Sequence, residues 1–278
     1  MLLADSAYGK SGVRLVQVAR HGDRHDVRDL TIAIRFEGDY DASYVEGTNR
    51  DVLPTDTMKN TVYALAARAA LEEPETFGMS LAEHFLERNP KASRVTIDLV
   101  EHVWRRIEVG GRDSGQSFLR HGPEKRSAQV RLDRQEAHVS AGVVDLVILK
   151  TAQSAFSGFP RDEFTTLPET RDRLLATSLT ATWRYDAGIA YGPAWRAVRN
   201  TLLEAFATHR SESVQHTLYA MGRAVLDAVP EVAEIHLVMP NRHHLPVDVA
   251  PFGLENRNEV FVATEEPFGL IQATVRRP

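Results

Sequence analysis

The sequence contains no cysteine among its 278 residues, so disulfide bonds, thiolate metal sites and cysteine nucleophiles are all excluded. It has no apolar run approaching the roughly 18 residues that span a membrane, and its N-terminus lacks the hydrophobic core of a signal peptide. Positive charge is not in excess, because 33 lysines and arginines face 38 acidic residues. The C-terminal residues VRRP are not a peroxisomal address of the Ser-Lys-Leu type. We therefore expect a cytoplasmic protein with no membrane or nucleic-acid partner.

The first half of the chain has the pattern of a hairpin followed by helices. The length suits one large domain or two of about 140 residues. Apolar and polar residues alternate at 29–38, as in a half-buried strand. The apolar positions are Leu30, Ile32, Ile34 and Phe36. With the apolar residues at 13–20, this segment predicts a β-hairpin. Two helices and a strand are expected next, at 56–73, 80–88 and 93–104.

The same order of elements recurs in the second half. Strands are expected at 141–150, 179–185 and 233–239, and helices at 194–209 and 213–229. Pro90 and Pro230 each close a second helix ahead of a strand. This repetition predicts an internal duplication into domains 1–136 and 137–278, with a boundary where residues 122–138 have no long apolar run. Hairpins alternating with helix pairs predict antiparallel sheets that carry helices on one face, an α+β fold.

The motif RHGDR at 20–24 invites two functional interpretations. Arg-His-Gly is a signature of histidine phosphatases, but Asp26 stands where that signature usually has proline, and a strand follows where a helix is required. His21 and Asp23 match half of a non-haem iron triad, but His25 is too close to complete it. We favour a polar hairpin loop in which Gly22 supplies the turn.

Two short polar segments precede the first strand and the first helix. Lys10 lies between Gly9 and Gly12, which allow close backbone packing, although an isolated lysine is usually a solvated charge. Thr55 and Asp56 lie just ahead of a helix, where such residues commonly cap backbone amides. The alternative is that this helix start presents amides and hydroxyls to an anion. The residues alone favour the cap.

The connection at 154–175 joins two predicted strands without clear periodicity, and connections of this length are frequently functional. Phe156 within it could stack on a planar ring or cover the core. Arg173 could pair with a planar anionic ligand or with a nearby acid. Gln215, at the start of the last predicted helix, could read a heterocycle edge with its amide or be an ordinary surface residue.

The segment PNRHH at 240–244 follows a predicted strand. The adjacent His243 and His244 could ligate a metal, transfer protons or lie on a solvated loop. A metal site would need further ligands, and Asp248 is the one candidate close by. The residues alone leave metal ligation and proton transfer both open.

Six segments, taken in order along nearly the whole chain, resemble the urate oxidase (uricase) family. They are YGK (8–10), TDTMKNTVY (55–63), QSFLR (116–120), FSGFPRDEFTTLPETRDR (156–173), SVQHTLYAM (213–221) and MPNRHH (239–244). One such segment would be weak, but six in family order are specific. The chain departs from the family at Gln116, often histidine, and at Ser157, often tryptophan.

The resemblance implies a tandem pair of tunnelling-fold (T-fold) domains, assembled as a homotetramer whose stacked barrels surround a tunnel. Active sites lie between subunits in this family. The resemblance also implies that Phe156 stacks on the purine ring of urate and that Arg173 and Gln215 hold its two ends. The backbone amide of Val214 is expected to add a hydrogen bond.

The remaining site positions concern oxygen and protons. The resemblance implies that an adjacent subunit donates Thr55 and Asp56 and that Asn241 holds O2 or water above the ring. Lys10, Thr55 and His243 are expected to form a proton relay, so His243 is assigned to proton transfer and His244 has no assigned role.

The implied reaction oxidises urate with O2 and water to 5-hydroxyisourate and hydrogen peroxide. Urate is an electron-rich acid whose dianion can pass an electron to oxygen, so no metal or organic cofactor is expected. A metal-dependent T-fold enzyme acting on a pterin or purine is one rival, disfavoured by the lack of cysteine and by dispersed histidines. A purine-binding protein without activity is another, and the presence of Lys10, Thr55 and His243 speaks against it.

Overall fold

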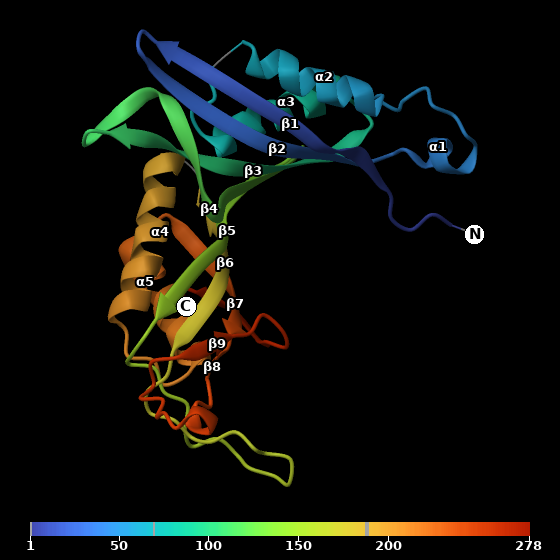
Figure 1. The fold of residues 1–278 in the computed structure, drawn as a ribbon. Coiled ribbons are helices and arrows are strands. Elements are labelled where there is room, and N and C mark those ends of the chain that lie inside the picture. Colours follow the sequence, from blue (N-terminus) through green and yellow to red (C-terminus); the bar gives the residue numbers. More distant parts are fainter. Residues whose placement is uncertain (1, 69, 187–188) are drawn as a thin grey trace. The chain divides into compact units, whose positions relative to one another are not determined.

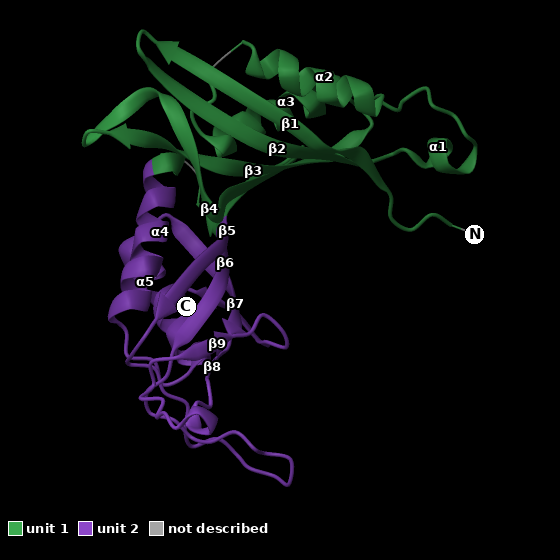
Figure 2. Cartoon of the chain, in the orientation of Figure 1, with its two compact units in different colours: residues 1–142, 184–192 green, residues 143–183, 193–278 purple. Residues whose placement is uncertain are grey.

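The computed structural model describes residues 2–68, 70–186 and 189–278 (Figure 1). The chain divides into two compact units, residues 1–142 with 184–192 and residues 143–183 with 193–278 (Figure 2). In chain order, each half runs through two strands, two main helices and two further main strands. The predicted α+β class is therefore confirmed. The division into duplicated domains at residue 136 stays a prediction.

Unit 1 is built on an antiparallel sheet with the strand order β1-β2-β3-β4. The strands are β1 (Ala7–His21), β2 (Arg24–Gly38), β3 (Ala92–Val109) and β4 (Arg112–Asp133). The helices are α1 (Asp41–Val45), α2 (Thr55–Ala66) and α3 (Pro74–Arg88). Helix α2 packs against β1, and α3 packs against β3 and β4 (Figure 1). The alternating apolar residues of β2 are buried beneath these helices, as their spacing predicts.

The motif RHGDR forms the turn of the β1–β2 hairpin. His21 pairs with Arg24, so Gly22 and Asp23 make a two-residue connection, and Gly22 has a φ of 64°. Such a turn needs positive φ, which glycine adopts without steric cost. The predicted polar turn is confirmed, although it is shorter than expected, because residues 24–28 belong to β2.

The predicted helix at 56–73 is wrong at its end, since α2 stops at Ala66 and α3 starts at Pro74. The Gln17 side chain donates to the Ala66 carbonyl over 2.6 Å and accepts from the Leu71 amide over 2.8 Å. The Arg28 guanidinium donates to the Leu71 carbonyl over 3.2 Å. These bonds from β1 and β2 replace the backbone bonds of a continued helix.

Most of residues 122–138, the segment without a long apolar run, lies in β4. Its charged residues Glu124 and Arg126 are buried, at 8% and 5% exposure. Arg126 pairs with Glu73 over 2.8 Å and with Glu75 over 2.6 Å, so α3 begins on a buried ion cluster. Burial raises the pKa of the Glu75 carboxyl, and the positive charge of Arg126 opposes that rise.

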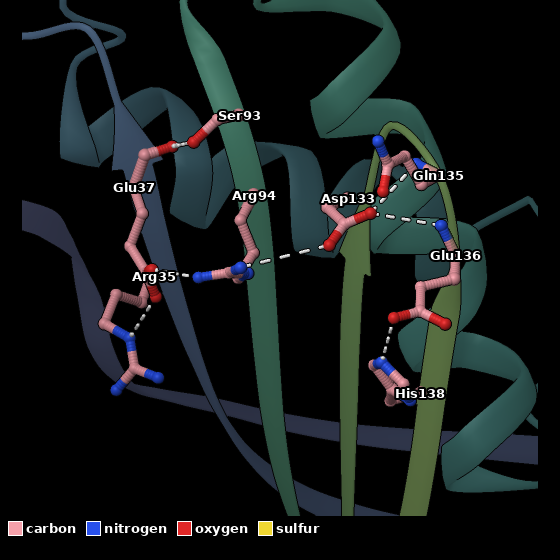
Figure 3. Close-up of polar contacts among 8 residues, drawn as sticks. All are labelled: Arg35, Glu37, Ser93, Arg94, Asp133, Gln135, Glu136 and His138. Atoms are coloured by element: carbon pink, nitrogen blue, oxygen red, sulfur yellow. Dashed lines mark hydrogen bonds and ion pairs between the residues drawn. The ribbon is translucent and has the colours of Figure 1, made fainter.

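A second polar network joins β2, β3 and the turn after β4 (Figure 3). Arg94 contacts Glu37 over 2.7 Å and Asp133 over 3.9 Å. Asp133 accepts the backbone amides of Gln135, over 2.9 Å, and Glu136, over 3.0 Å. These two bonds lower the pKa of the Asp133 carboxyl. The turn that leads into the next strand is therefore held by one carboxylate.

Unit 2 has the same succession of main strands and helices, and its strand order is β5-β6-β7-β10. The main strands are β5 (Ala137–Lys150), β6 (Leu175–Tyr185), β7 (Val232–Arg242) and β10 (Gly269–Arg276), of which residues 137–142 and 184–185 are assigned to unit 1. The helices are α4 (Tyr191–Thr208), α5 (Val214–Ala228) and the short η1 (Ala250–Phe252). Short strands β8 (His244–Pro246) and β9 (Phe261–Ala263) pair with each other.

Helix α5 packs against β7 and β10 through an apolar face. Its buried residues include Val214, Leu218, Met221 and Val225. Strand β10, which the sequence analysis did not identify, pairs antiparallel with β7. Of the helices that the structure describes, none combines the length and apolar character needed to cross a membrane.

Replacing Arg126 by leucine should strongly destabilise unit 1, because Glu73 and Glu75 would lose their buried cation. We expect Arg126→Leu to lower the free energy of unfolding by about 3–5 kcal/mol in urea titrations. Arg223→Leu is the matched control, since Arg223 and Asp227 form an exposed pair on α5 and should contribute little. Equal effects of the two substitutions would show that the buried cluster is not a stabilising element.

Candidate active site

A cavity of about 450 Å³ lies in unit 2, where the β5–β6 connection meets the start of α5 and the end of β7. Six residues to which the family resemblance assigns a role line it. They are Phe156, Arg173, Val214, Gln215, Asn241 and His243. Among these six, Phe156 and His243 are 87 positions apart in the sequence, and the fold brings them to the same cavity.

The β5–β6 connection, residues 151–174, is described throughout and forms neither helix nor extended strand. Its shape depends on isolated backbone pairings. Phe156 and Thr170 exchange two backbone hydrogen bonds, of 2.8 and 3.0 Å, and the Arg173 amide donates to the Ser154 carbonyl over 2.8 Å. These bonds bring Phe156 and Arg173 to the cavity from opposite ends of the loop.

Arg173 is a half-buried cation without a carboxylate partner among the described residues. Its Cζ lies 5.4 Å from the centroid of the Phe156 ring, and its Nε is buried without a hydrogen-bond acceptor. Burial lowers the pKa of the Arg173 guanidinium. Phe156 also stacks on Phe159, with centroids 4.8 Å apart and planes at 15°. A cation beside an aromatic face suits a flat, anionic ligand.

The start of α5 adds polar groups to the cavity. Ser213 is the N-cap, and its hydroxyl accepts the His216 amide over 3.1 Å. Val214 is the first helical residue, so its amide has no acceptor within the helix. Gln215 follows with an exposed side chain. This helix start therefore offers a backbone donor and a carboxamide side by side.

The end of β7 supplies the remaining wall. Asn241 is only 9% exposed and pairs with Gly269 of β10. His243 lies just after β7, and its carbonyl accepts the Thr264 amide over 2.9 Å. His244 begins β8, lines the cavity as well, and its Nδ1 lies 3.2 Å from the Arg242 carbonyl oxygen. In the part of the chain that is described, no group of three or more histidines and acids is placed to hold a metal ion.

Lys10 belongs to unit 1, at an irregularity in β1. A side chain at Gly9 would bring its Cβ to 1.8 Å from the Ile34 carbonyl oxygen, so only glycine fits there. Gly12 has a φ of 71°. The two glycines thus permit the local backbone path on which Lys10 is carried.

Thr55 and Asp56 also belong to unit 1, and the predicted N-cap role is wrong. Helix α2 begins at Thr55, its N-cap is Pro54, and no side chain caps it. Asp56 accepts hydrogen bonds from Lys59 and, over 3.0 Å, from Asn60. The Lys59 bond and charge lower the pKa of the Asp56 carboxyl, and the charge of Lys10 acts in the same direction. Lys10 therefore lies within electrostatic reach of the α2 start.

Several cavity residues were not identified from the sequence. They include Asp172, Asn258, Phe261 and Ile271. Asp172 lies within 156–173, one of the segments that resemble the uricase family, and this position was the available indication of a role in the site. Ile271 lies on β10 and pairs with Met239, and no local pattern had predicted that strand.

Comparison with known proteins supports the resemblance along the whole chain. The uricase family model matches residues 6–131 and 139–272. A uricase from Arthrobacter globiformis is 41% identical over 278 residues, covering 100% of this chain and 90% of the relative. A uricase from Danio rerio is 37% identical over 284 residues, covering 98% and 94%.

Solved structures agree with the sequences. The crystal structure of the Arthrobacter globiformis uricase superposes with a TM-score of 0.95 at 41% identity, covering 100% of this chain and 95% of the other. A uricase from Bacillus fastidious has a TM-score of 0.84 at 24% identity, covering 98% and 93%, which shows the shared fold. The predicted tunnelling fold and the predicted resemblance are confirmed. The chain belongs to the uricase family.

Proposed function

We propose that this chain oxidises urate with O2 and water to 5-hydroxyisourate and hydrogen peroxide, without a metal or organic cofactor. Membership of the uricase family supports the reaction. The observation that carries it is Arg173, a half-buried guanidinium with no carboxylate partner in the described chain, beside the Phe156 ring. A cation held in this state is available to a planar anion in the cavity.

Binding would use the flat shape and the negative charge of urate. Phe156 would stack on the purine ring. Arg173 and Gln215 would hold opposite ends of the ring, because a guanidinium fork and a carboxamide match its oxygen and nitrogen edge. The Val214 amide at the helix start would donate one more hydrogen bond.

The chemistry needs proton removal, because the dianion of urate passes an electron to O2 more readily than the monoanion does. Lys10, Thr55 and His243 would relay the protons. Asn241 carries no charge and can hydrogen-bond O2, water or peroxide without retaining them. Urate loses two electrons and O2 gains them, giving hydrogen peroxide. Water supplies the hydroxyl group of 5-hydroxyisourate, so the atoms and electrons of the reaction balance.

The proposal includes a homotetramer with active sites between subunits. Lys10, Thr55 and Asp56 belong to unit 1, whereas the cavity residues belong to unit 2. A neighbouring subunit would supply Thr55 and Asp56 and close the cavity against bulk water. A cytoplasmic location stays a prediction from the sequence.

Oxygen uptake by purified protein with urate, after exhaustive chelation, tests the function. We expect uptake to persist without metal and to yield one peroxide per urate. Uptake that vanishes on chelation and returns with a metal would contradict the cofactor-free mechanism. Urate binding without uptake in either condition would indicate a purine-binding protein.

Loss of a relay residue should lower turnover more than it weakens binding. We expect Lys10→Ala and Thr55→Ala to lower kcat about 10²- to 10⁴-fold, because proton transfer in the transition state is lost. Thr55→Ser is the matched control, since it keeps the hydroxyl and should retain most activity. Unchanged kcat in both alanine variants would rule out the relay.

Loss of the cavity cation should instead weaken urate binding. We expect Arg173→Ala to raise KM about 10- to 100-fold, the equivalent of one hydrogen bond to a charged group. Arg171→Ala is the control, because Arg171 is exposed in the same loop and does not line the cavity. A near-normal KM in Arg173→Ala would contradict the assigned role.

A further inference from the structure

We propose that Asp172 is a positioning residue, whose carboxylate holds a left-handed turn at Gln153 and thereby sets the distance between Phe156 and Arg173. This inference rests on the proposed function of the cavity. Asp172 lines the cavity next to Arg173, and no role was assigned to it above.

Gln153 has an unfavourable backbone conformation. Its φ is 60°, in the left-handed region, where the Cβ of any residue but glycine crowds the backbone. Such a conformation persists only when the surroundings stabilise it. The Gln153 amide donates to Asp172 Oδ1 over 2.7 Å, and its carbonyl accepts the Ser211 amide over 2.9 Å. Both backbone groups of this residue are therefore held by partners far along the chain.

The bonds around Gln153 form one ladder that leads to the ligand-binding residues. The next rung joins the Ser154 carbonyl to the Arg173 amide over 2.8 Å, and a later one joins Phe156 to Thr170. At the first rung the acceptor is the Asp172 side chain, which substitutes for a backbone carbonyl. The Thr170 hydroxyl donates to the Asp172 carbonyl over 3.0 Å and fixes the backbone there. Asp172 thus accepts the last of the hydrogen bonds that align the two sides of the loop.

The charge of Asp172 needs an explanation, because a carboxylate in a cavity that binds an anion is electrostatically unfavourable. Asp172 does not neutralise its neighbour, since Arg173 has no carboxylate partner among the described residues. Its Oδ1 is engaged with the Gln153 amide instead. The hydrogen bond to Oδ1 assigns Asp172 as an oxygen acceptor, a role that does not require its negative charge.

Three variants separate the acceptor from the charge. Asp172→Ala removes both and should raise KM for urate about 10- to 100-fold, the cost of leaving the Gln153 amide without its acceptor, with a smaller change in kcat. Asp172→Asn keeps an oxygen acceptor and removes the charge, so its KM should be equal to or below that of the unmodified protein. Gln153→Gly combined with Asp172→Ala should restore much of the lost affinity, because glycine adopts positive φ freely.

Three outcomes would overturn the proposal: an unchanged KM in Asp172→Ala, a KM in Asp172→Asn as high as in Asp172→Ala, or no recovery in the double variant. If Asp172→Ala does not fold, Asp172→Asn decides alone. A KM at or below normal then supports the acceptor role, and a raised KM overturns it.

Hydrogen exchange without urate keeps this test separate from the proposed function. Amides of residues 151–156 should exchange faster in Asp172→Ala and at the normal rate in Asp172→Asn. Normal exchange in Asp172→Ala would overturn the proposal even in an active enzyme. If the unmodified protein does not oxidise urate, the exchange result still decides whether Asp172 holds the loop, and only the proposed function fails.

Discussion

The need to cover the apolar face of the sheet strands in each unit constrains the rest of this structure. In unit 1, β2 places Leu30, Ile32, Ile34 and Phe36 on one side, and all four are nearly inaccessible to solvent. A pair of helices removes that face from water, and such burial is the main favourable contribution to folding. The helices occupy the sheet face, so ligand-binding groups are left to strand ends, helix starts and connections. The cavity of unit 2 lies at such a place.

Two arginines removed from solvent to different degrees have different surroundings, one suited to stabilising the fold and the other to binding a ligand. Arg126 is 5% exposed and has two carboxylates, Glu73 and Glu75, within 2.8 Å. Arg173 is less deeply buried, and no carboxylate in the described chain neutralises it. A buried charge is tolerated in a fold when it is paired. The unpaired one marks the place where an anion would complete the interactions.

The loop that carries Phe156 and Arg173 has no regular secondary structure, yet it is extensively hydrogen-bonded. Its rungs join residues 153–156 to residues 170–173 and to Ser211, just ahead of α5. The loop and the start of α5 are therefore positioned by the same bonds. Phe156 and Arg173 are positioned by these pairings, whereas Val214, Gln215 and Asn241 are positioned by α5 and β7.

The sequence by itself determined the elements whose pattern is local. Alternation in β2, the apolar face of α5 and the glycine of the RHGDR turn each depend on near neighbours, and six segments in order identified the family. Only the tertiary structure decided where α2 ends, since Gln17 and Arg28 bind the backbone of residues 66, 71 and 72 while the local sequence stays alanine-rich. It also decided β4, whose inward Arg126 is acceptable in a core only because Glu73 and Glu75 lie opposite. The role of Asp172 likewise depends on a turn nineteen residues away. These features depend on contacts between distant parts of the chain, which no local pattern records.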